Sequence, residues 1–373
     1  MQEIEYSSNQ NKLYFFNFSP WRMMQIEDFF YAPDNKKIIC KTLNEAMERG
    51  LDKVSNIFIY GVIELPDIQA YADENNITIY RIEDAFIRSV ALGSSFSKPY
   101  SLSIDSRGIY FDPRKSSDLE YLFQNHDFSD ELIERAKKVR AEVLSSKFSK
   151  YNHLGHSEIR IDREKYSKVI LVTGQVEDDM SVKFGAYGLN NSDLLEMVKK
   201  NNPKAYIIYK PHPDVLSGNR IGDILQEITD RCANEIQKNI SIDSCIAVAD
   251  EVHTLTSGAG FDALLRGKAV FTYGMPFYAG WGLTIDHRKC ERRTRTLTLD
   301  ELIATTLILF PRYISPKTGT FCEVEQTLEE LKEEQEKYFS NRLYRYKINL
   351  KGYLLPRIRK IIRVILKPFK LKV

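Results

Sequence analysis

The hydrophobic and polar positions in the first third of the chain form short apolar runs separated by segments with helical spacing. Three runs predict strands: NIFIYGVI (56–63), ITIYRIE (77–83) and GIYFD (108–112). DIQAYADENN (67–76) and residues 129–147 space their apolar residues as amphipathic helices do. DAFIRSVALGSS (84–95) ends in the small residues of a turn. Strands that alternate with helices indicate a parallel sheet covered on both faces.

The second half of the chain repeats this pattern. Strands are predicted at KVILVTG (168–174), AYIIYKPHP (205–213) and AVFTYG (269–274). CIAVADEVHTLTSG (245–258) carries two short apolar runs and then a turn. Helices are predicted at SDLLEMVKKN (192–201), FDALLRG (261–267) and LTLDELIATTLIL (297–309). Pro311 stops the last of these helices.

Together the two halves predict an α/β protein of two Rossmann-like domains that face each other across a cleft. The polar stretch 149–165 is the predicted linker. The chain then divides into a domain at 1–160, a domain at 161–322, an acidic helix at 323–341 that crosses back, and a tail at 342–373. Ligands of such sheets bind beyond the carboxyl ends of the strands, so these ends hold the candidate site residues.

Composition narrows the class of protein. With 373 residues, 43% of them hydrophobic, the chain can fill two domain cores. Its first residues lack a basic segment followed by an apolar one, and no run of about 18 apolar residues follows, so we expect neither a secretory leader nor a membrane-spanning helix. The five cysteines, at 40, 232, 245, 290 and 322, lack paired spacing and indicate reduced thiols in a cytoplasmic protein.

Charge is distributed unevenly along the chain. The tail at 342–373 contains eleven Lys and Arg residues and no acid, so removing it from the net charge of +2 leaves −9 for residues 1–341. One helical stripe of the tail holds Leu354, Ile358, Ile361 and Ile365, with Lys360, Arg363 and Lys367 elsewhere on the helix. This pattern predicts an amphipathic helix that lies on an anionic membrane surface. The alternative is a disordered basic tail.

Two strand ends carry groups suited to an anion. Thr256, Ser257 and Gly258 open a predicted helix, whose free N–H groups and dipole favour a phosphate, and Asp262 lies one turn further, within reach of a ribose hydroxyl. Ordinary helix capping is the alternative. The Lys210-Pro-His212-Pro213 segment offers a second phosphate contact, or else a surface loop.

Five acidic residues follow two other strands: Glu177, Asp178, Asp179, Glu83 and Asp84. Paired carboxylates suit glycosyl transfer, with one as nucleophile and one as acid/base. They suit Mg²⁺ equally well, and an acidic loop without a role is the third possibility.

The most aromatic stretch of the chain is also one of its richest in glycine. YGMPFYAGWG (273–282) combines four aromatic residues, among them Tyr273, Phe277 and Trp281, with three glycines and no charge. Glycines allow backbone to approach a base edge and aromatic rings can enclose it, so we interpret the segment as the lid of a nucleotide pocket. The alternative is a buried aromatic turn.

Long segments of the chain resemble the capsule polysaccharide β-Kdo transferases of Gram-negative bacteria, or KpsC-type capsule proteins. These segments are EDAFIRSVALGS, SLSIDSRGIYFDP, GQVEDDMSV, YKPHPDV, DEVHTLTSGAGFDALLRGKAV, YGMPFYAGWGLT and RRTRTLTLDELIATTLILFPRYISPKTG. They cover residues 77–325. Those enzymes often carry two such modules in tandem, whereas this chain has one and is most similar to the C-terminal module.

The resemblance implies a GT-B-like fold, with an acceptor-side first domain and a second domain that binds the CMP-sugar. It implies CMP-β-Kdo as the donor, a double displacement that retains the β configuration, and Kdo on a lysophospholipid as the acceptor. No metal, no other cofactor and no nucleic acid partner are expected. The expected location is the cytoplasmic, inner face of the inner membrane, bound peripherally to the anionic leaflet near other capsule assembly proteins.

The matching motifs also imply roles for individual residues. Those expected to act in catalysis are Asp179 as nucleophile, Glu83 as acid/base, Asp84 and Gln175. Those expected to bind the donor are Lys210, His212, Pro213, Thr256, Ser257, Gly258, Asp262, Tyr273, Phe277 and Trp281. Arg88 is the candidate partner of a substrate carboxylate. The family commonly has Gly at position 85 and Glu at 262, where this chain has Ala85 and Asp262, which alters local geometry but removes no named group.

Other functions remain open from the sequence. A sugar-nucleotide epimerase shares the two-domain plan and a phosphate-binding helix, although the Gln175–Asp179 and His212-Pro213 motifs argue against it. Another GT-B-like glycosyltransferase, including one that depends on Mg²⁺, is a second alternative. A non-catalytic export or scaffold protein is a third, although its acidic and His residues would then have no role.

Overall fold

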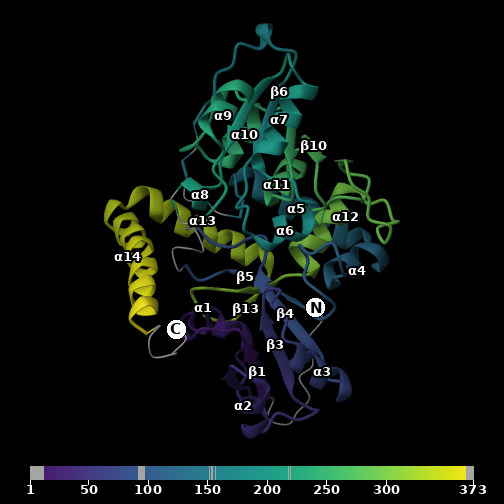
Figure 1. Cartoon of the computed structure of the whole chain (residues 1–373), viewed down its shortest axis with the longest axis vertical. Coiled ribbons are helices and arrows are strands. Elements are labelled where there is room, and N and C mark those ends of the chain that lie inside the picture. Colours follow the sequence, from purple (N-terminus) through teal and green to yellow (C-terminus); the bar gives the residue numbers. More distant parts are fainter. Residues whose placement is uncertain are drawn as a thin grey trace. The chain divides into compact units, whose positions relative to one another are not determined.

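The structure is a computed structural model that describes residues 12–90, 97–150, 152, 154–155, 157–216, 218 and 220–366. The predictions for the chain start, for the end of the turn at 91–96, for Lys367 and for the end of the tail lie outside these residues. The chain forms two compact units, each with its own sheet (Figure 1): unit 1, Met1–Ile109 with Leu309–Val373, and unit 2, Tyr110–Ile308.

Unit 1 contains a mixed sheet of seven strands in the order β13-β12-β5-β4-β3-β1-β2. The strands are β1 Lys12–Phe16, β2 Lys36–Cys40, β3 Asn56–Tyr60, β4 Ile79–Asp84, β5 Ser101–Asp105, β12 Arg312–Ile314 and β13 Phe321–Cys322. The first four run parallel, and β5, β12 and β13 add antiparallel pairs. The helices are α1 Pro20–Ile26, η1 Glu27–Phe30, α2 Leu43–Glu48, α3 Pro66–Glu74, α13 Val324–Ser340 and α14 Arg342–Leu366.

Hydrophobic alternation in β1 builds both faces of the unit 1 sheet. Leu13 and Phe15 enter one buried cluster, whereas Tyr14 and Phe16 enter the other. On the first face, the ring of Phe15 stacks on that of Phe58 with centroids 5.0 Å apart. The predicted strands at 56–63 and 77–83 and the helix at 67–76 are confirmed as β3, β4 and α3.

The third strand predicted for this unit was misplaced. The strand is β5 at Ser101–Asp105, and residues 108–112 are irregular. SLSID looked polar, yet Ser101 and Ser103 are buried because their hydroxyls donate to the carbonyls of Ile87 and Glu83. A serine whose hydroxyl is hydrogen-bonded to the backbone can be buried in a strand, so the hydrophobic pattern of the sequence does not reveal that strand.

Unit 2 contains a sheet of six parallel strands in the order β11-β10-β9-β6-β7-β8. The strands are β6 Val169–Thr173, β7 Tyr206–Lys210, β8 Glu235–Ile236, β9 Glu251–Thr254, β10 Ala269–Thr272 and β11 Ile285–Asp286. The helices are α4 Asp118–Asn125, α5 Asp130–Ser145, η3 Arg163–Lys165, α6 Met180–Gly185, α7 Asn191–Asn201, α8 Pro213–Leu216, α9 Gln226–Cys232, α10 Ile242–Val248, α11 Gly258–Leu265, α12 Leu299–Ile303 and η4 Ala304–Leu309.

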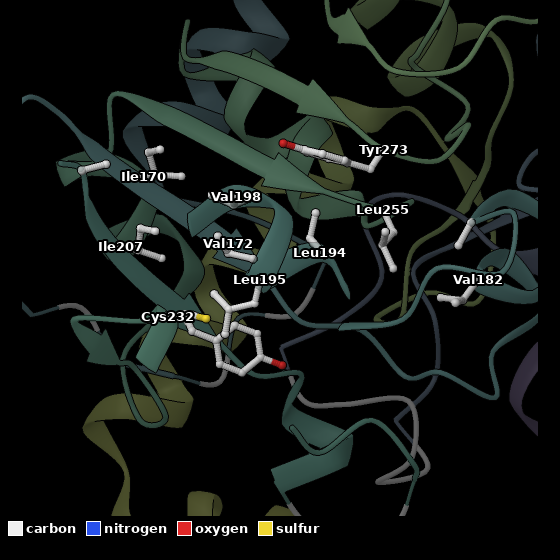
Figure 2. Packing of buried hydrophobic residues seen from close by; sticks show 13 residues of the cluster. Ile170, Val172, Val182, Leu194, Leu195, Val198, Ile207, Cys232, Leu255 and Tyr273 are labelled. Atoms are coloured by element: carbon white, nitrogen blue, oxygen red, sulfur yellow. The ribbon is translucent and has the colours of Figure 1, made fainter. Parts of the chain in front are cut away.

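The core of unit 2 lies between the sheet and α7. Figure 2 shows Val172 of β6 beside Leu194 and Leu195 of α7, with Ile170 further along the strand, and all four side chains are fully buried. The strands predicted at 168–174, 205–213 and 269–274 and the helices at 129–147, 192–201 and 261–267 are confirmed. These segments were predictable because burial on both sheet faces gives the strands continuous apolar runs.

The division of the chain differs from the predicted one. We expected the first domain to reach residue 160, but residues 110–160 belong to unit 2. Arg140 of α5 donates to the carbonyl of Leu265 at 2.8 Å, and the predicted linker packs on α10, where the N–H of Ser157 donates to Ser244. The return to unit 1 begins at residue 309, because β12 and β13 complete its sheet before α13 starts.

Candidate functional site

Four predicted site segments of unit 2 follow neighbouring parallel strands. β7, β6, β9 and β10 lie side by side in the sheet, so their carboxyl ends share one edge. The segments 175–179, 211–214, 256–258 and 273–282 follow these strands directly. The parallel topology therefore gathers most of the residues that were predicted to bind the donor, as expected for a site at this edge.

Gln175 joins two of these loops. Its side-chain Nε2 donates to Oγ1 of Thr256 at 2.9 Å, and its Oε1 accepts the backbone N–H of Thr256 at 2.8 Å. Asn191 holds the backbone of Gln175 by a second pair of bonds, each under 3 Å, to its N–H and its carbonyl. Gln175 is buried, so it fixes the loop after β6 against the loop after β9.

The three carboxylates after β6 have different surroundings. Glu177 accepts the N–H of Asn191 at the start of α7, and Asp178 pairs with Arg220 at 3.0 Å. Asp179 caps α6: its Oδ1 accepts the N–H of Ser181 at 2.9 Å and the hydroxyl of the same residue at 2.7 Å. These bonds orient the carboxylate, and within the described residues its Oδ2 has no hydrogen-bond donor.

His212 lies within electrostatic range of Asp179. Burial lowers the pKa of His212, and the carboxylates of Asp214 and Asp179 oppose this shift. The Nδ1 of His212 accepts the backbone N–H of Asp214 at 3.1 Å, so the neutral ring carries its proton on Nε2. His212 is therefore prepared to donate a hydrogen bond from Nε2 without carrying a charge. His212 is half-buried between two prolines, and its contact with a phosphate stays a prediction.

Two cations near His212 were missed from the sequence. The charges of Arg220 and Lys150 both act on His212, and Lys150 also acts on Asp262 of α11. The loop after β7 and the first turns of α11 thus share one electrostatic environment. Lys150 fell in the predicted linker and Arg220 in no predicted element, so no sequence motif identified either residue.

Lys210 is placed differently from the prediction. Its side chain is 5% exposed, and its Nζ donates to the backbone carbonyl of Gln237 at 3.1 Å. Burial lowers the pKa of Lys210. The ammonium therefore holds the loop after β8, and its contact with a donor stays a prediction.

The start of α11 retains part of its capacity to bind an anion. The N–H of Thr256 is used by Gln175, that of Ser257 by Oγ1 of Thr254, and Ser257 caps the helix by accepting from Ala259. A Cβ on Gly258 would meet open space, and its N–H has no partner within the described residues. Gly258 and the hydroxyl of Ser257 are thus the groups left for a phosphate.

Asp262 has an altered proton affinity. Burial raises the pKa of Asp262 to about 6, although Arg266 and Lys150 oppose the shift. The guanidinium of Arg266 turns instead to Asp243 at 2.8 Å and to the carbonyl of Asp262. A half-buried carboxyl with a raised pKa is a suitable partner for a hydroxyl, as predicted for a ribose.

The aromatic segment 273–282 is a buried turn in this structure. Tyr273, Phe277, Tyr278 and Trp281 are all under 9% exposed, and the indole of Trp281 donates to the carbonyl of Phe277 at 2.9 Å. The rings fill the interior of unit 2, which matches the alternative to a lid. Their contact with a nucleotide stays a prediction.

Protein packing, rather than a ligand, explains the glycines of this segment. A Cβ on Gly274 would lie 2.4 Å from the carbonyl oxygen of Gly185, and Gly280 and Gly282 have φ of 82°. Tyr278, which sequence reasoning missed, donates to the carbonyl of Ser257 at 2.5 Å. Its hydroxyl lies where a Cβ of Gly260 would be, so the turn fixes the start of α11.

In unit 1, the predicted acid pair lies at the end of β4. The Oε1 of Glu83 accepts the hydroxyl of Tyr60, and the Oδ2 of Asp84 accepts the Nε of Arg88 at 2.5 Å. Arg88 is 3% exposed, so its guanidinium is committed to Asp84 and to the hydroxyl of Ser89. Its role toward a substrate carboxylate stays a prediction, and Tyr60 is a further residue that no motif indicated.

Two structural features bear on cofactors and membranes. Across the residues that the structure describes, no three His, Cys, Asp or Glu side chains gather in a way that would hold a metal ion. No helix within the same residues is long and apolar enough to cross a bilayer.

Comparison with known proteins gives clear relatives. The protein family described as capsule polysaccharide biosynthesis protein matches residues 66–313. The capsule polysaccharide modification protein LipA of Neisseria meningitidis serogroup A is 43% identical over 310 residues, 83% of this chain and 44% of LipA. The lipopolysaccharide-processing protein LpsZ of Rhizobium meliloti is 38% identical over 272 residues, 72% of this chain and 62% of LpsZ. The chain thus spans about half the length of LipA.

Two solved structures are similar over nearly the whole chain. The β-Kdo 2,7 transferase of Thermosulfurimonas dismutans KpsC has a TM-score of 0.69 at 34% identity, covering 87% of this chain and 100% of that chain. The β-Kdo 2,4 transferase of the same KpsC has a TM-score of 0.75 at 29% identity, covering 88% and 99%.

Proposed function

Because the chain belongs to the capsule polysaccharide biosynthesis protein family, we propose that it is a retaining β-Kdo transferase. It uses CMP-β-Kdo to extend a Kdo linker on a lipid acceptor. The names of the two similar KpsC structures, both β-Kdo transferases, support the reaction class. The new linkage is to the 7-hydroxyl or the 4-hydroxyl of Kdo, since sequence identity is higher to the 2,7 transferase and the TM-score is higher to the 2,4 transferase.

The arrangement of Asp179 is the observation that carries the proposal. Of the three carboxylates after β6, Glu177 and Asp178 are used by Asn191 and Arg220. Asp179 is oriented through Oδ1 by Ser181, which leaves Oδ2 to react. It also lies within electrostatic range of His212, the proposed phosphate ligand. A nucleophile needs this combination of fixed orientation and proximity to the leaving group.

Retention requires two displacements at the anomeric carbon C2 of Kdo. In the first, Oδ2 of Asp179 forms a bond to C2 while the bond from C2 to the phosphate oxygen breaks, and CMP leaves with that electron pair. In the second, the acceptor hydroxyl attacks C2, the bond to Asp179 breaks, and Glu83 takes the hydroxyl proton. Glu83 accepts the Tyr60 hydroxyl, which orients its carboxylate for this role.

The donor phosphate is bound by a mixture of neutral donors and cations. Nε2 of His212 donates to it, Ser257 and Gly258 add a hydroxyl and an N–H, and Lys150 and Arg220 supply positive charge. His212→Ala should therefore weaken CMP binding while the fold survives. Unchanged CMP affinity in that variant would contradict this assignment.

The acceptor in this proposal is Kdo on a lysophospholipid, so the reaction takes place at the inner face of the inner membrane. Other capsule proteins that supply the first Kdo or carry the product onward are the expected neighbours. We propose that no metal or cofactor takes part, and activity should survive EDTA. A Mg²⁺-dependent transferase would lose its activity in EDTA.

The decisive experiment supplies CMP-Kdo and a synthetic Kdo-lipid acceptor to the purified protein. The expected product carries one further Kdo in the β configuration, read by mass spectrometry and by NMR of the new linkage. Asp178→Asn, which changes the neighbouring acid, is the matched control for Asp179→Asn and should keep most of the activity. Turnover of a UDP-sugar, or thermal protection by UDP rather than CMP, would favour the epimerase. Protection by neither nucleotide would favour a non-catalytic capsule export component.

A further inference from the structure

The last helix of unit 1 presents a continuous apolar face to solvent. α14 exposes large side chains at helical spacing, among them Leu343, Tyr346, Leu350, Leu354 and Ile358. Their exposed fractions lie between 38% and 63%. Positions three and four residues apart share one side of a helix, so these residues form a single stripe over four turns. Leu354 and Ile358 also belong to the stripe predicted from the sequence, and the helical backbone extends to Leu366.

The neighbouring helix covers a different side of α14. α13 packs on α14, where the hydroxyl of Tyr338 donates to Asn349 at 2.9 Å and that of Tyr344 donates to Glu334 at 3.4 Å. Only Asn341 separates the two helices, and its side chain caps α14 through the N–H of Tyr344. The five stripe residues remain exposed although this partner is present.

α13 is itself fixed to the sheet of unit 1. Glu334 accepts the hydroxyl of Tyr100 at 2.5 Å, and the buried Glu330 accepts the hydroxyl of Ser315, which follows β12. The α13–α14 pair, shown in yellow-green and yellow in Figure 1, is therefore a fixed extension of unit 1 rather than a loose tail. Any surface that covers the stripe is held at a set distance from that sheet.

Charge identifies the occupant of this face. The segment from 342 to 373 contains eleven basic residues and no acid, whereas the preceding 341 residues carry −9. Arg342, Lys347 and Lys351 beside the stripe are exposed. A second copy of this chain would present a basic face to a basic face, which like-charge repulsion disfavours. An apolar stripe bordered by cations matches an anionic bilayer surface, where the stripe enters the acyl boundary and the cations meet phosphates.

We propose that α14 docks flat on an anionic lipid surface through the face formed by Leu343, Tyr346, Leu350, Leu354 and Ile358. Docking would hold unit 1 beside a lipid-linked acceptor. The identity of that acceptor rests on the proposed function. The lipid contact itself rests on the exposed stripe and its charge. At 1.5 Å per residue the 25 residues of α14 lie along about 37 Å of the surface.

The test is binding of the full chain to vesicles, without donor or acceptor. Vesicles of equal parts phosphatidylglycerol and phosphatidylcholine should bind the wild type at least about tenfold more tightly than phosphatidylcholine alone, since each basic residue near the surface contributes. The triple variant Leu343→Ser, Leu350→Ser, Leu354→Ser, called the stripe variant, should lose most of this binding. Val54→Ser, Ile221→Ser, Leu225→Ser removes three apolar side chains elsewhere that are even more exposed and should bind as the wild type does.

A second variant tests the basic residues separately, in case the stripe variant does not fold. Lys347→Glu, Lys351→Glu leaves the stripe intact and should reduce binding to the anionic vesicles only. Circular dichroism and a thermal melt confirm that each variant is folded. The proposal is overturned if the stripe variant binds like the wild type or if the wild type ignores phosphatidylglycerol. It is also overturned if the wild type is a dimer that the stripe variant converts to a monomer.

A separate arm distinguishes this inference from the proposed function. Transfer of Kdo to a short, soluble Kdo acceptor should be equal in the wild type and the stripe variant, because α14 carries no proposed site residue. Vesicle binding without any transfer would refute the proposed function and leave the docking intact. Transfer without vesicle binding would refute the docking and leave the proposed function intact.

Discussion

The hydroxyl of Tyr60 donates to Oε1 of Glu83 at 3.0 Å, from the end of one parallel strand to the end of the next. The guanidinium of Arg22 lies over the Tyr60 ring, 3.6 Å from its centroid. Burial raises the pKa of Tyr60 well above its ordinary value, and the charges of Asp84 and Glu83 add to the shift. Tyr60 therefore remains a hydrogen-bond donor at every working pH and orients Glu83.

Tyr60→Phe should impair the proposed transfer without unfolding unit 1. The variant keeps the ring under Arg22 and removes one bond to a charged acceptor, so we expect about a tenfold loss of turnover, corresponding to about 1.4 kcal/mol. The charged form of Glu83 also loses a donor, so the acidic limb of the pH–rate profile should move to higher pH. Both are measured from initial rates across a pH series.

Tyr14→Phe is the matched control for this variant. Tyr14 is another buried tyrosine of the unit 1 sheet, and its hydroxyl donates to the carbonyl of Arg49 at 2.9 Å, on the other face. Its removal should change stability and leave the pH profile of transfer in place. Identical profiles for Tyr60→Phe and the wild type would show that the Tyr60 bond has no part in the reaction.

Gln175→Leu should destabilise unit 2 by roughly 2–4 kcal/mol. The substitution leaves the N–H and the hydroxyl of Thr256 without partners in a buried position, and each such group costs about 1–3 kcal/mol. The cost is read from the midpoint of urea unfolding. Gln124→Leu is the control: Gln124 also bonds a hydroxyl and a backbone N–H, both of Thr294, but at an exposed position where water can replace these bonds, so its loss should cost less than that of Gln175. Equal losses of unfolding free energy in the two variants would contradict the stabilising role of Gln175 between the two loops.

Much of unit 2 could be predicted because its sheet is parallel and buried. The runs that became β6, β7 and β10 are apolar up to their last residue, and the polar residues that follow them had to meet at one edge. The position of Asp179 at the carboxyl end of β6 was therefore predictable. Its selection over Asp178 came from the family resemblance, and the structure adds that the two carboxylates differ in their partners, Ser181 for Asp179 and Arg220 for Asp178.

Long-range contacts explain what the sequence did not reveal. Tyr60 and Glu83 are 23 residues apart, and Gln175 and Thr256 are 81 apart, so no local pattern relates them. The glycines of 273–282 indicated a close backbone approach, but not that Gly185 supplies the approaching group. The boundary after residue 109 was missed because the apolar spacing of α5 shows that one side of the helix is buried, but not which of the two units buries it.

Stability should fall as the pH is lowered through the range of His253. This side chain is 2% exposed, and its ring contacts the hydroxyl of Tyr273 at 3.1 Å and Glu251 at 3.2 Å. Burial lowers the pKa of His253 to about 4, against the opposing effect of Glu251. Because the unfolded chain takes up the proton first, the folded state loses about 1.4 kcal/mol per pH unit between about 6.5 and 4.

The contribution of His253 is isolated by comparison with a variant that does not titrate. Asp262, whose pKa is raised to about 6, acts in the opposite sense, because the folded state takes up its proton first as the pH falls from about 6 toward 4. The wild-type slope is therefore a sum of opposing contributions. His253→Gln should therefore gain urea stability relative to the wild type as the pH falls from about 6.5 to 4, by the share of His253 alone. Parallel curves for the two proteins would refute this assignment.

The last prediction concerns the covalent intermediate on Asp179. Mixing the protein with CMP-Kdo, without acceptor, should add one Kdo to the peptide that contains Asp179, because the second displacement then lacks its hydroxyl. Glu83→Gln should increase the trapped fraction, since it removes the base of that step. Intact mass followed by peptide mapping reads both results.

Two neighbouring variants decide whether the adduct belongs to Asp179. Asp179→Asn preserves the cap on Ser181 through its amide oxygen, so it should stay folded while adduct and transfer both disappear. Asp178→Asn weakens only an exposed pair with Arg220, so it should form the adduct as the wild type does. The nucleophile assignment fails if Asp179→Asn still transfers Kdo at the wild-type rate. It fails equally if the adduct maps to a peptide without Asp179, because a double displacement needs the carboxylate that was covalently modified.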